Sequence, residues 1–405
     1  MKRFFILYIL PVIALMAILS SCGDNDEPAP VEPETPAEPD KPVDPEHDPD
    51  DANKTPLTLL IYMVADNSLG TLGFAEQDLS EISTAMSENA LGDNARLLVY
   101  KSMPGVNKGV VPELVEFTDG TPDPKLLKSY PDDPSIYSTS EERMAEVLED
   151  VREIAPAKEY GLIMWSHSTA WRTEDSALPA RSFGQDRDRR MAIPALGRVL
   201  NKFSHKFIYF DCCLMANVEV AYELRHATPL IVASGAEVHG DGMPYQQTVP
   251  IFAKGDARAV AEKTFEYYDN RSGVDRWCTQ SVIETDKLDR LAAATRSLME
   301  TATPLSSTRG IQTYTPTSSF RTYDMDDYVS RISAGETAYQ TWQAVLAEAV
   351  TYKASTPYVN GNHRIAKYCG LSSNIVTSAN DASKYHYNEL QWWADVVSHN
   401  PNFAE

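Results

Sequence analysis

The chain has few cysteines and no excess of positive charge. Only 5 of its 405 residues are cysteine, so a scaffold held by disulfide bonds is not expected, and a free thiol could have a function. Lys and Arg total 36 against 58 Asp and Glu, and the formal net charge is −22. A charge of this sign argues against nucleic acid as the main partner.

An apolar run long enough to cross a bilayer is also missing. The run from Phe4 to Ile18 follows the basic pair Lys2 and Arg3 and is shorter than the roughly 20 residues that a membrane helix needs. We therefore interpret residues 1–22 as a signal peptide. Its end, Leu-Ser-Ser-Cys22, resembles the lipobox of bacterial lipoproteins, which predicts a lipid on Cys22 that anchors the protein to a membrane. The alternative is ordinary cleavage beside an incidental cysteine.

Residues 23–54 form an acidic, proline-rich segment with 12 Asp or Glu, two Lys and eight Pro. Such a segment cannot bury enough apolar surface to offset the entropy of ordering, so we predict a disordered, extended tether. Asp24, Asp26 and Glu27 resemble the surface-export signal of Bacteroidetes lipoproteins and favour an exported protein at the outer membrane or cell surface. The remaining residues, 55–405, are enough for one large domain.

Within this domain, apolar runs alternate with helical patterns, which predicts an α/β fold with a mostly parallel sheet and helices on both faces. We expect strands at residues 57–64, 95–101, 160–165, 206–210, 229–234 and 278–284. Between them we expect helices at residues 74–88, 140–154, 194–203, 216–226, 257–269 and 288–301. Residues 103–138 suit a loop or short hairpin. The C-terminal part is less regular, with a helix near 341–352, a short strand near 371–376 and helical structure over 385–397.

Two of the expected strands end next to reactive side chains. The run 160–165 leads into Ser166 and His167, and the run 206–210 leads into Asp211, Cys212 and Cys213. Ligands of open α/β sheets bind beyond the carboxyl ends of the strands, so His167 and Cys213 could converge as a nucleophilic pair. The alternative is that Cys213 is a small buried hydrophobic residue.

The sequence motifs around these residues resemble those of the clostripain family (family C11) of cysteine peptidases. The similar blocks are Tyr62-Met-Val-Ala-Asp-Asn-Ser-Leu69, Asp211-Cys-Cys-Leu-Met215 followed by Glu219-Val-Ala-Tyr222, and the block from Ser234 to Tyr245. The resemblance spans about residues 57–397. It implies a caspase-like three-layer sandwich and a cysteine endopeptidase that acts on proteins or peptides.

The resemblance also assigns roles to individual residues. It implies that Cys213 is the nucleophile, that His167 is the general base and acid, and that the backbone N–H groups of Ser168 and Cys213 bind the oxyanion. Cys212 falls on a variable position. Ser168 stands where the family usually has glycine, and serine tolerates positive φ poorly. A catalytically inactive surface lipoprotein that uses this fold for binding or as a scaffold therefore stays open.

Specificity and processing follow from the same resemblance. Family members that cut after Arg or Lys are similar to this chain at Asp211 and Asp241, which implies a pocket for a basic side chain. Alternatively, Asp211 caps a turn and Asp241 is a turn residue between two glycines. The family often cuts itself between the histidine and the cysteine, so Arg187, Arg189 and Arg190 are candidate processing sites. An arginine-rich loop is otherwise a solvated surface.

The predicted chemistry requires no cofactor, and we expect no metal site. Glu237 and His239 near Asp241 have no zinc-type spacing. Asp324, Asp326 and Asp327 suggest calcium, but the glycine and glutamate of an EF-hand loop are absent, so no motif supports it.

Overall fold

The computed structural model describes residues 54–131, 135–171, 183–316, 321–384 and 386–403. The predictions for the signal peptide 1–22, for Cys22 and for the tether 23–54 lie outside the described residues, apart from Lys54. None of the described helices combines the length and the apolar character needed to cross a membrane.

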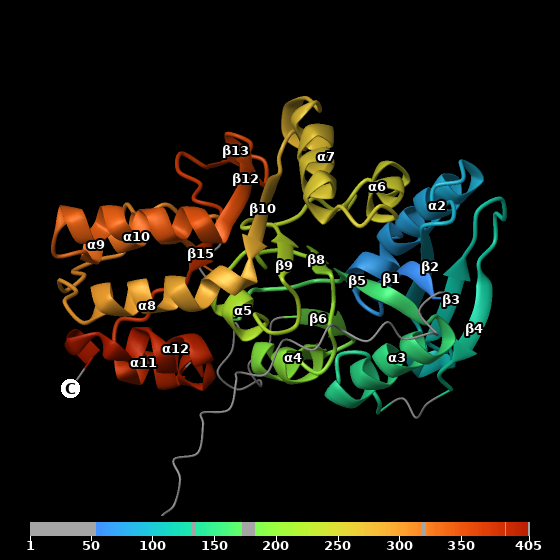
Figure 1. Ribbon diagram of the computed structural model, residues 1–405, viewed down its shortest axis with the longest axis horizontal. Coiled ribbons are helices and arrows are strands. Elements are labelled where there is room, and N and C mark those ends of the chain that lie inside the picture. Colours follow the sequence, from blue (N-terminus) through green and yellow to red (C-terminus); the bar gives the residue numbers. More distant parts are fainter. Residues whose placement is uncertain (1–53, 132–134, 172–182, 317–320, 385, 404–405) are drawn as a thin grey trace, which may run out of the picture. The chain divides into compact units, whose positions relative to one another are not determined.

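The fold is organised around a nine-stranded sheet. Its order is β12-β10-β9-β8-β5-β1-β2-β3-β4, which Figure 1 shows from left to right. The strands are β1 (Thr55–Val64), β2 (Ala95–Ser102), β3 (Glu113–Phe117), β4 (Lys125–Ser129), β5 (Ala157–Trp165), β8 (Phe207–Asp211), β9 (Leu230–Ala233), β10 (Thr279–Glu284) and β12 (Val350–Ser355). The pairs that join β9, β8, β5, β1 and β2 are parallel. The four outer pairs are antiparallel.

Short paired segments and helices complete the described residues. The segments are β6 (Phe183–Asp186) with β7 (Arg189–Met191), β11 (Tyr323–Asp324) with β15 (Ser372–Ser373), and β13 (Tyr358–Val359) with β14 (His363–Arg364). The helices are α1 (Ser68–Thr71), α2 (Phe74–Ser87), α3 (Glu141–Ile154), α4 (Ile193–Leu200), α5 (Val218–Glu223), α6 (Tyr245–Phe252), α7 (Ala257–Asp269), α8 (Leu288–Met299), α9 (Met325–Ile332), α10 (Glu336–Ala349), α11 (Ala379–Lys384) and α12 (Gln391–Asp395).

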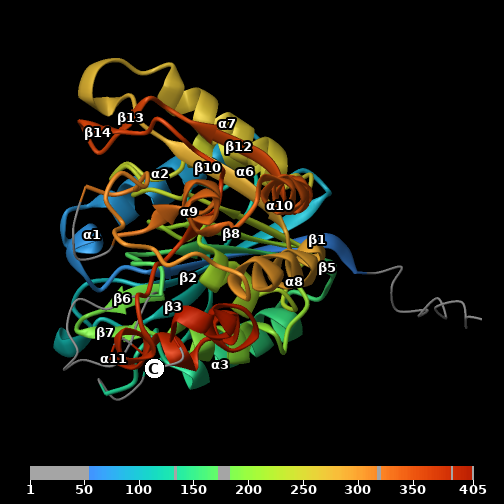
Figure 2. The ribbon, with the colours of Figure 1, turned by 90° about the vertical axis from the view of Figure 1, so that its left-hand side faces the viewer.

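Both faces of the sheet are covered, which confirms the predicted three-layer arrangement. Successive side chains of a strand point to opposite faces, so Leu60 and Tyr62 of β1 join one core and Leu59 and Ile61 join the other. Side chains of α3, α4, α5 and α8 pack in the first core, and those of α2, α6 and α7 pack in the second. In Figure 2, α7 accordingly lies toward the top of the view and α3 toward the bottom, with the strands of the sheet between them.

The sheet is mostly parallel at its centre, as predicted, and its antiparallel strands lie at the two edges. β10 runs antiparallel to β9. Its buried segment, Thr-Gln-Ser-Val-Ile-Glu, could be predicted as a strand, but its local sequence does not specify the direction. The helix expected to reach residue 352 ends at Ala349, and Val350–Ser355 becomes the edge strand β12. The strand expected at 371–376 shrinks to the two residues of β15. The segment 103–138 does contain a hairpin, β3–β4.

Candidate active site

The histidine and the cysteine leave the same edge of the sheet from neighbouring strands. Trp165 of β5 and Asp211 of β8 are register partners, and each ends its strand. His167 and Cys213 both follow two residues later. The hydroxyl of Ser168 donates a hydrogen bond to the carbonyl oxygen of Cys213, so the two segments touch. The structure thus places the two candidate residues on neighbouring segments that are in contact.

Ser166 holds the start of the histidine segment. Its buried hydroxyl donates to the carbonyl oxygen of Val64 at 2.7 Å and accepts from the backbone N–H of Gln185 at 3.0 Å. The next residue, His167, is half-buried, and its Nε2 lies 2.8 Å from the hydroxyl oxygen of Ser68. Burial lowers the pKa of His167 to about 4, and the nearby charge of Arg190 acts in the same direction. The imidazole is therefore neutral at physiological pH.

The two adjacent cysteines have different surroundings. Cys212 is buried, and its thiol lies 2.9 Å from the carbonyl oxygen of Met164. Cys213 is only half-buried, and its sulfur accepts a hydrogen bond from the backbone N–H of Val238 at 3.3 Å. Burial raises the pKa of Cys213 to about 11, although the Val238 N–H opposes this shift. At physiological pH Cys213 is therefore a thiol and His167 a neutral imidazole.

The backbone dihedral angles around Ser168 show whether this position needs the conformational freedom of glycine. Among the described residues other than glycine, positive φ occurs close to the site at Ala170 (φ 56°) and Leu214 (φ 64°), but not at Ser168. Ser168 forms an antiparallel bridge with Phe183 of β6. The conformation at this position is therefore one that serine adopts without strain, and the backbone N–H that an oxyanion would need is retained.

Asp211 belongs to a pair of buried carboxylates. Its Oδ2 accepts hydrogen bonds from the backbone N–H of Met243 at 3.2 Å and from the hydroxyl of Tyr245 at 3.1 Å. Asp78 of α2, 1% exposed, accepts a hydrogen bond from the indole N–H of Trp165 at 2.7 Å. Burial raises the pKa of both carboxyl groups, and the proximity of Asp211 raises that of Asp78 further.

Asp78 was missed in the sequence. It shares the buried face of α2 with Ala75, Ile82 and Ala85. A carboxylate within an apolar helical stripe is the signal that could have revealed it.

The second carboxylate predicted to select the substrate, Asp241, has a partner within the chain. Its Oδ2 lies 2.8 Å from Nη1 of Arg271 and 3.5 Å from Nδ1 of His239. The guanidinium of Arg271 also stacks over the rings of Tyr267 and Tyr268, at 4.6 and 4.8 Å from their centroids. Asp241 is only partly exposed in this ion pair, so a substrate cation would have to compete with Arg271.

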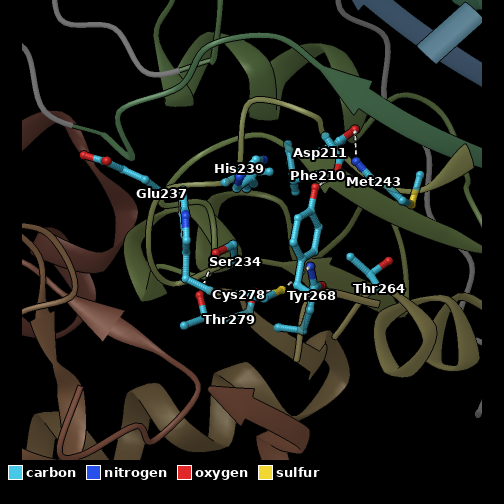
Figure 3. A pocket seen from close by; sticks show the side chains of 14 residues that line it. Phe210, Asp211, Ser234, Glu237, His239, Met243, Thr264, Tyr268, Cys278 and Thr279 are labelled. Carbon is cyan, nitrogen blue, oxygen red and sulfur yellow. Dashed lines mark hydrogen bonds between the residues drawn. The ribbon is translucent and has the colours of Figure 1, made fainter. Parts of the chain in front are cut away.

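A small pocket lies beside the candidate nucleophile, and Figure 3 shows the side chains around it. Its lining comes from the end of β8, the loop after β9, α7 and β10, and comprises Phe210, Asp211, Ser234, Glu237, Val238, His239, Gly242, Met243, Thr264, Tyr268, Trp277, Cys278, Thr279 and Gln280. Asp211 lines this pocket, whereas Asp241 does not. Glu237 is a second carboxylate in the wall, held by the side chains of Thr315 and Asn360.

The three candidate processing residues lie in the β6–β7 hairpin and differ in accessibility. Arg187 has φ 55° and a side chain only 11% exposed, 3.0 Å from Asp186 Oδ1 and stacked on the ring of Tyr137. Arg190 donates a hydrogen bond to the side chain of Gln185 at 2.9 Å. The side chain of Arg189 is 50% exposed. The preceding part of this arginine-rich segment, 172–182, lies outside the described residues.

No group of three or more His, Cys, Asp or Glu side chains within the described ranges is arranged to hold a metal ion. The three aspartates considered for calcium have separate roles. Asp324 caps α9 and accepts from the backbone N–H of Asp327 at 2.8 Å. Asp326 accepts from Tyr339, and Asp327 pairs with Lys367 at 2.6 Å.

A cysteine and a histidine at adjacent strand ends of a three-layer α/β sandwich define the arrangement of a cysteine hydrolase. Comparison with known families agrees with this class. The profile of the clostripain family matches residues 61–397, and the chain belongs to this family of cysteine peptidases. A search of curated proteins gives no match.

Solved structures of the same kind are similar to nearly the whole domain. An inactive zymogen C11 protease from Parabacteroides distasonis is 31% identical, with a TM-score of 0.72 over 85% of this chain and 98% of that chain. A secreted C11 cysteine protease from Bacteroides thetaiotaomicron bound to an irreversible peptide inhibitor is 26% identical, with a TM-score of 0.72, covering 84% and 98%. The secreted protease "iotapain" from the same organism, at 22% identity, 84% and 99% coverage and a TM-score of 0.73, supports the fold.

Proposed function

We propose that this peptidase cleaves proteins or peptides after Arg or Lys, with Cys213 as nucleophile and His167 as general base. The observation that carries the proposal is the common origin of the two residues, two positions beyond the register pair Trp165 and Asp211. The contact between Ser168 and the carbonyl of Cys213 supports it further. The peptide inhibitor bound to a C11 relative agrees with a peptide substrate.

The resting protonation states define the first step. Because the thiol and the imidazole are both neutral, His167 takes the proton of Cys213 as the sulfur attacks the scissile carbonyl carbon. The negative oxygen that forms is stabilised by the backbone N–H groups of Ser168 and Cys213. The protonated imidazole then gives its proton to the leaving amine, and a thioester forms. Water, deprotonated by His167, hydrolyses this ester and restores the thiol.

Charge in the pocket supports the preference for a basic residue. Asp211 lies at the end of the strand that carries Cys213, and its carboxylate lines the pocket. The free volume of the pocket, about 10 Å³, holds no more than one water, so substrate binding must open it. A guanidinium or ammonium that then enters would favour the charged form of Asp211, which burial alone disfavours. Asp241 contributes once the substrate replaces Arg271 as its partner.

Self-processing after an arginine between His167 and Cys213 is part of the proposal. Arg189 is the most accessible of the three candidates, whereas cleavage at Arg187 would require its contacts with Asp186 and Tyr137 to break. Intact-mass measurement of the wild type and of Cys213→Ala tests this step. A single full-length species in both proteins would rule it out.

We also propose the export arrangement: signal peptide 1–22, lipid on Cys22, tether 23–54 and peptidase domain 55–405 with a less regular C-terminal part. The domain is thereby anchored at the outer membrane or cell surface. The description of C11 relatives as secreted is compatible with this location. Detergent-phase partition of the protein expressed in bacteria, compared with that of Cys22→Ala, provides the test. Equal partition of both proteins into the detergent phase would contradict the lipid anchor.

The decisive experiment uses peptides that carry a fluorogenic group after Arg, Lys or Leu. We expect the wild type to cleave the Arg and Lys peptides and Cys213→Ala to cleave none. Cys212→Ala is the matched control, because it removes a neighbouring thiol that faces the interior. Equal turnover of Arg and Leu peptides would contradict the specificity. Activity that survives in Cys213→Ala would contradict the nucleophile.

The second candidate function, a binding or scaffold module without turnover, has one observation in its favour. The hydroxyl of Ser168 is bound to the carbonyl of Cys213, where the family usually has no side chain. An acyloxymethyl ketone probe with arginine next to the reactive group separates the two functions. Labelling of Cys213 that disappears in His167→Ala supports the peptidase, whereas absence of labelling in the wild type supports the module.

A further inference from the structure

Ser68 makes a contact with His167 that the predicted Cys–His pair does not account for. Its hydroxyl oxygen lies 2.8 Å from Nε2 of the imidazole. No other hydrogen bond reaches this ring from the part of the chain that the structure describes. Because a hydrogen bond fixes which ring nitrogen faces its partner, Ser68 helps to orient the half-buried imidazole.

The position of Ser68 is fixed by its neighbour, Asn67. The side-chain oxygen of Asn67 caps α1 by accepting from the backbone N–H of Leu69 at 2.8 Å. Its side-chain N–H₂ group donates to the carbonyl oxygens of Val64 at 2.9 Å and Gln185 at 2.6 Å, and it lies 3.4 Å from the hydroxyl of Ser166. One asparagine therefore ties the helix that carries Ser68 to the segment that carries His167.

The hydroxyl of Ser68 could donate to an unprotonated Nε2 or accept from Nε2–H, and only the accepting role survives when the ring becomes an imidazolium. A neutral imidazole carries one N–H group and one acceptor nitrogen, and the partner of each nitrogen selects the tautomer. A hydroxyl can accept a hydrogen bond from Nε2–H both in the neutral ring and in the imidazolium. With the proton held on Nε2, Nδ1 is the nitrogen that is free to take a proton.

We propose that Ser68 is a positioning residue for His167, which holds the Nε2–H tautomer and turns Nδ1 toward the thiol of Cys213. The inference rests on the proposed function. As the sulfur attacks the substrate, the S–H bond of Cys213 breaks and an N–H bond forms on Nδ1 of His167. Ser68 keeps its own proton throughout and accepts the hydrogen bond from Nε2–H. It thus stabilises the imidazolium beside the opposing positive charge of Arg190.

Three variants test this role. Ser68→Ala removes the hydroxyl, and Ser68→Thr keeps it, with room for the added methyl group because position 68 is exposed. Thr71→Ala is the matched control: it removes a hydroxyl from the same helix, where Thr71 binds the carbonyl oxygen of Ser68 at 3.1 Å and does not contact the ring. The assays are peptide hydrolysis, the rate of Cys213 alkylation by iodoacetamide across pH, and nitrogen NMR of the histidine side chains.

For Ser68→Ala we expect kcat to fall about tenfold, the effect of one net hydrogen bond, with KM within about twofold of the wild type. Cys213 alkylation at neutral pH should slow in parallel, and its pH profile should move upward. Ser68→Thr should recover most of the rate, and Thr71→Ala should behave as the wild type. The His167 resonances should report the Nε2–H tautomer in the wild type and a mixture in Ser68→Ala.

Other outcomes overturn the inference. A rise in kcat of Ser68→Ala would mean that the hydroxyl blocks the base, and an Nδ1–H tautomer in the wild type would mean that Nε2 is the basic nitrogen. Equal losses in Ser68→Ala and Thr71→Ala would indicate a structural effect on α1. The NMR and alkylation measurements need no turnover, so they test Ser68 even if no peptide is cleaved and the proposed function fails.

Discussion

The turn at Gly242 offers a quantitative test of how tightly the two buried carboxylates are packed. Gly242 has φ 65°, and a Cβ atom added there would lie 3.1 Å from Asp78 Oδ2 and 3.2 Å from Asp211 Oδ2. Both distances are shorter than ordinary van der Waals contacts. Gly242→Ala therefore adds two costs, a left-handed backbone and a methyl group pressed against the carboxylates.

The structure contains a control for the first cost alone. Gly273 has φ 67°, and a Cβ atom there would meet nothing within 4 Å. Gly273→Ala should lower the free energy of unfolding by roughly 1–2 kcal/mol, the cost of the left-handed conformation for a residue with a side chain. Gly242→Ala should lower the free energy of unfolding by this amount and by roughly a further 1–3 kcal/mol, because the added methyl group crowds a packed site.

Urea denaturation followed by tryptophan fluorescence measures both variants, with the midpoints compared at equal slope. We expect the midpoint of Gly242→Ala to lie clearly below that of Gly273→Ala. The KM of Gly242→Ala for arginine peptides should also rise, because the added methyl group displaces Asp211 in the pocket. Equal losses of stability in the two variants would refute the packing of Asp78 and Asp211 against this turn.

Three further predictions concern the same region. Burial raises the pKa of Asp78, so the folded state keeps a proton that the unfolded chain loses, and stability falls as pH rises above the ordinary carboxyl range. Between pH 5 and pH 8, the free energy of unfolding of Asp78→Asn should therefore rise by at least about 1 kcal/mol relative to that of the wild type. The same pH dependence of the urea midpoint in both proteins would contradict this. Arg271→Met frees Asp241 from a partly exposed ion pair and should lower KM for arginine peptides about two- to fivefold, with leucine peptides as the control. Ser168→Gly should keep kcat within about threefold, because no positive φ is needed at 168; a gain above about tenfold would show that serine impairs the enzyme.

The central part of the fold could be predicted from the sequence because its strands are buried on both faces. Uninterrupted apolar runs such as that of β1 are typical of strands in a parallel sheet, and parallel neighbours bring their carboxyl ends to one edge. His167 and Cys213 could be found for the same reason. Strand direction at the sheet edge could not, because the local sequence of β10, Thr-Gln-Ser-Val-Ile-Glu, predicts a strand but does not specify its direction, which depends on how α7 returns the chain.

Contacts between residues that are distant in the sequence could not be predicted either. Asp241 and Arg271 are 30 residues apart, and nothing in either segment predicts that they pair. Ser68 and His167 are 99 residues apart, so only the fold reveals their contact. The contrast between Cys212 and Cys213 was predictable in part, since adjacent strand residues face opposite ways.

The placement of Asp211 has a consequence for how substrate preference diverges among related peptidases. Asp211 ends the strand that leads to Cys213, accepts hydrogen bonds from Met243 and Tyr245, and is the register partner of Trp165 on the histidine strand. A substitution there shifts the backbone that carries the thiol, so a new preference would be gained together with damage to catalysis. Asp241 and Arg271 belong to other segments, and mutations there leave that backbone in place. Diverging lineages should therefore accumulate changes at positions 241 and 271 before position 211.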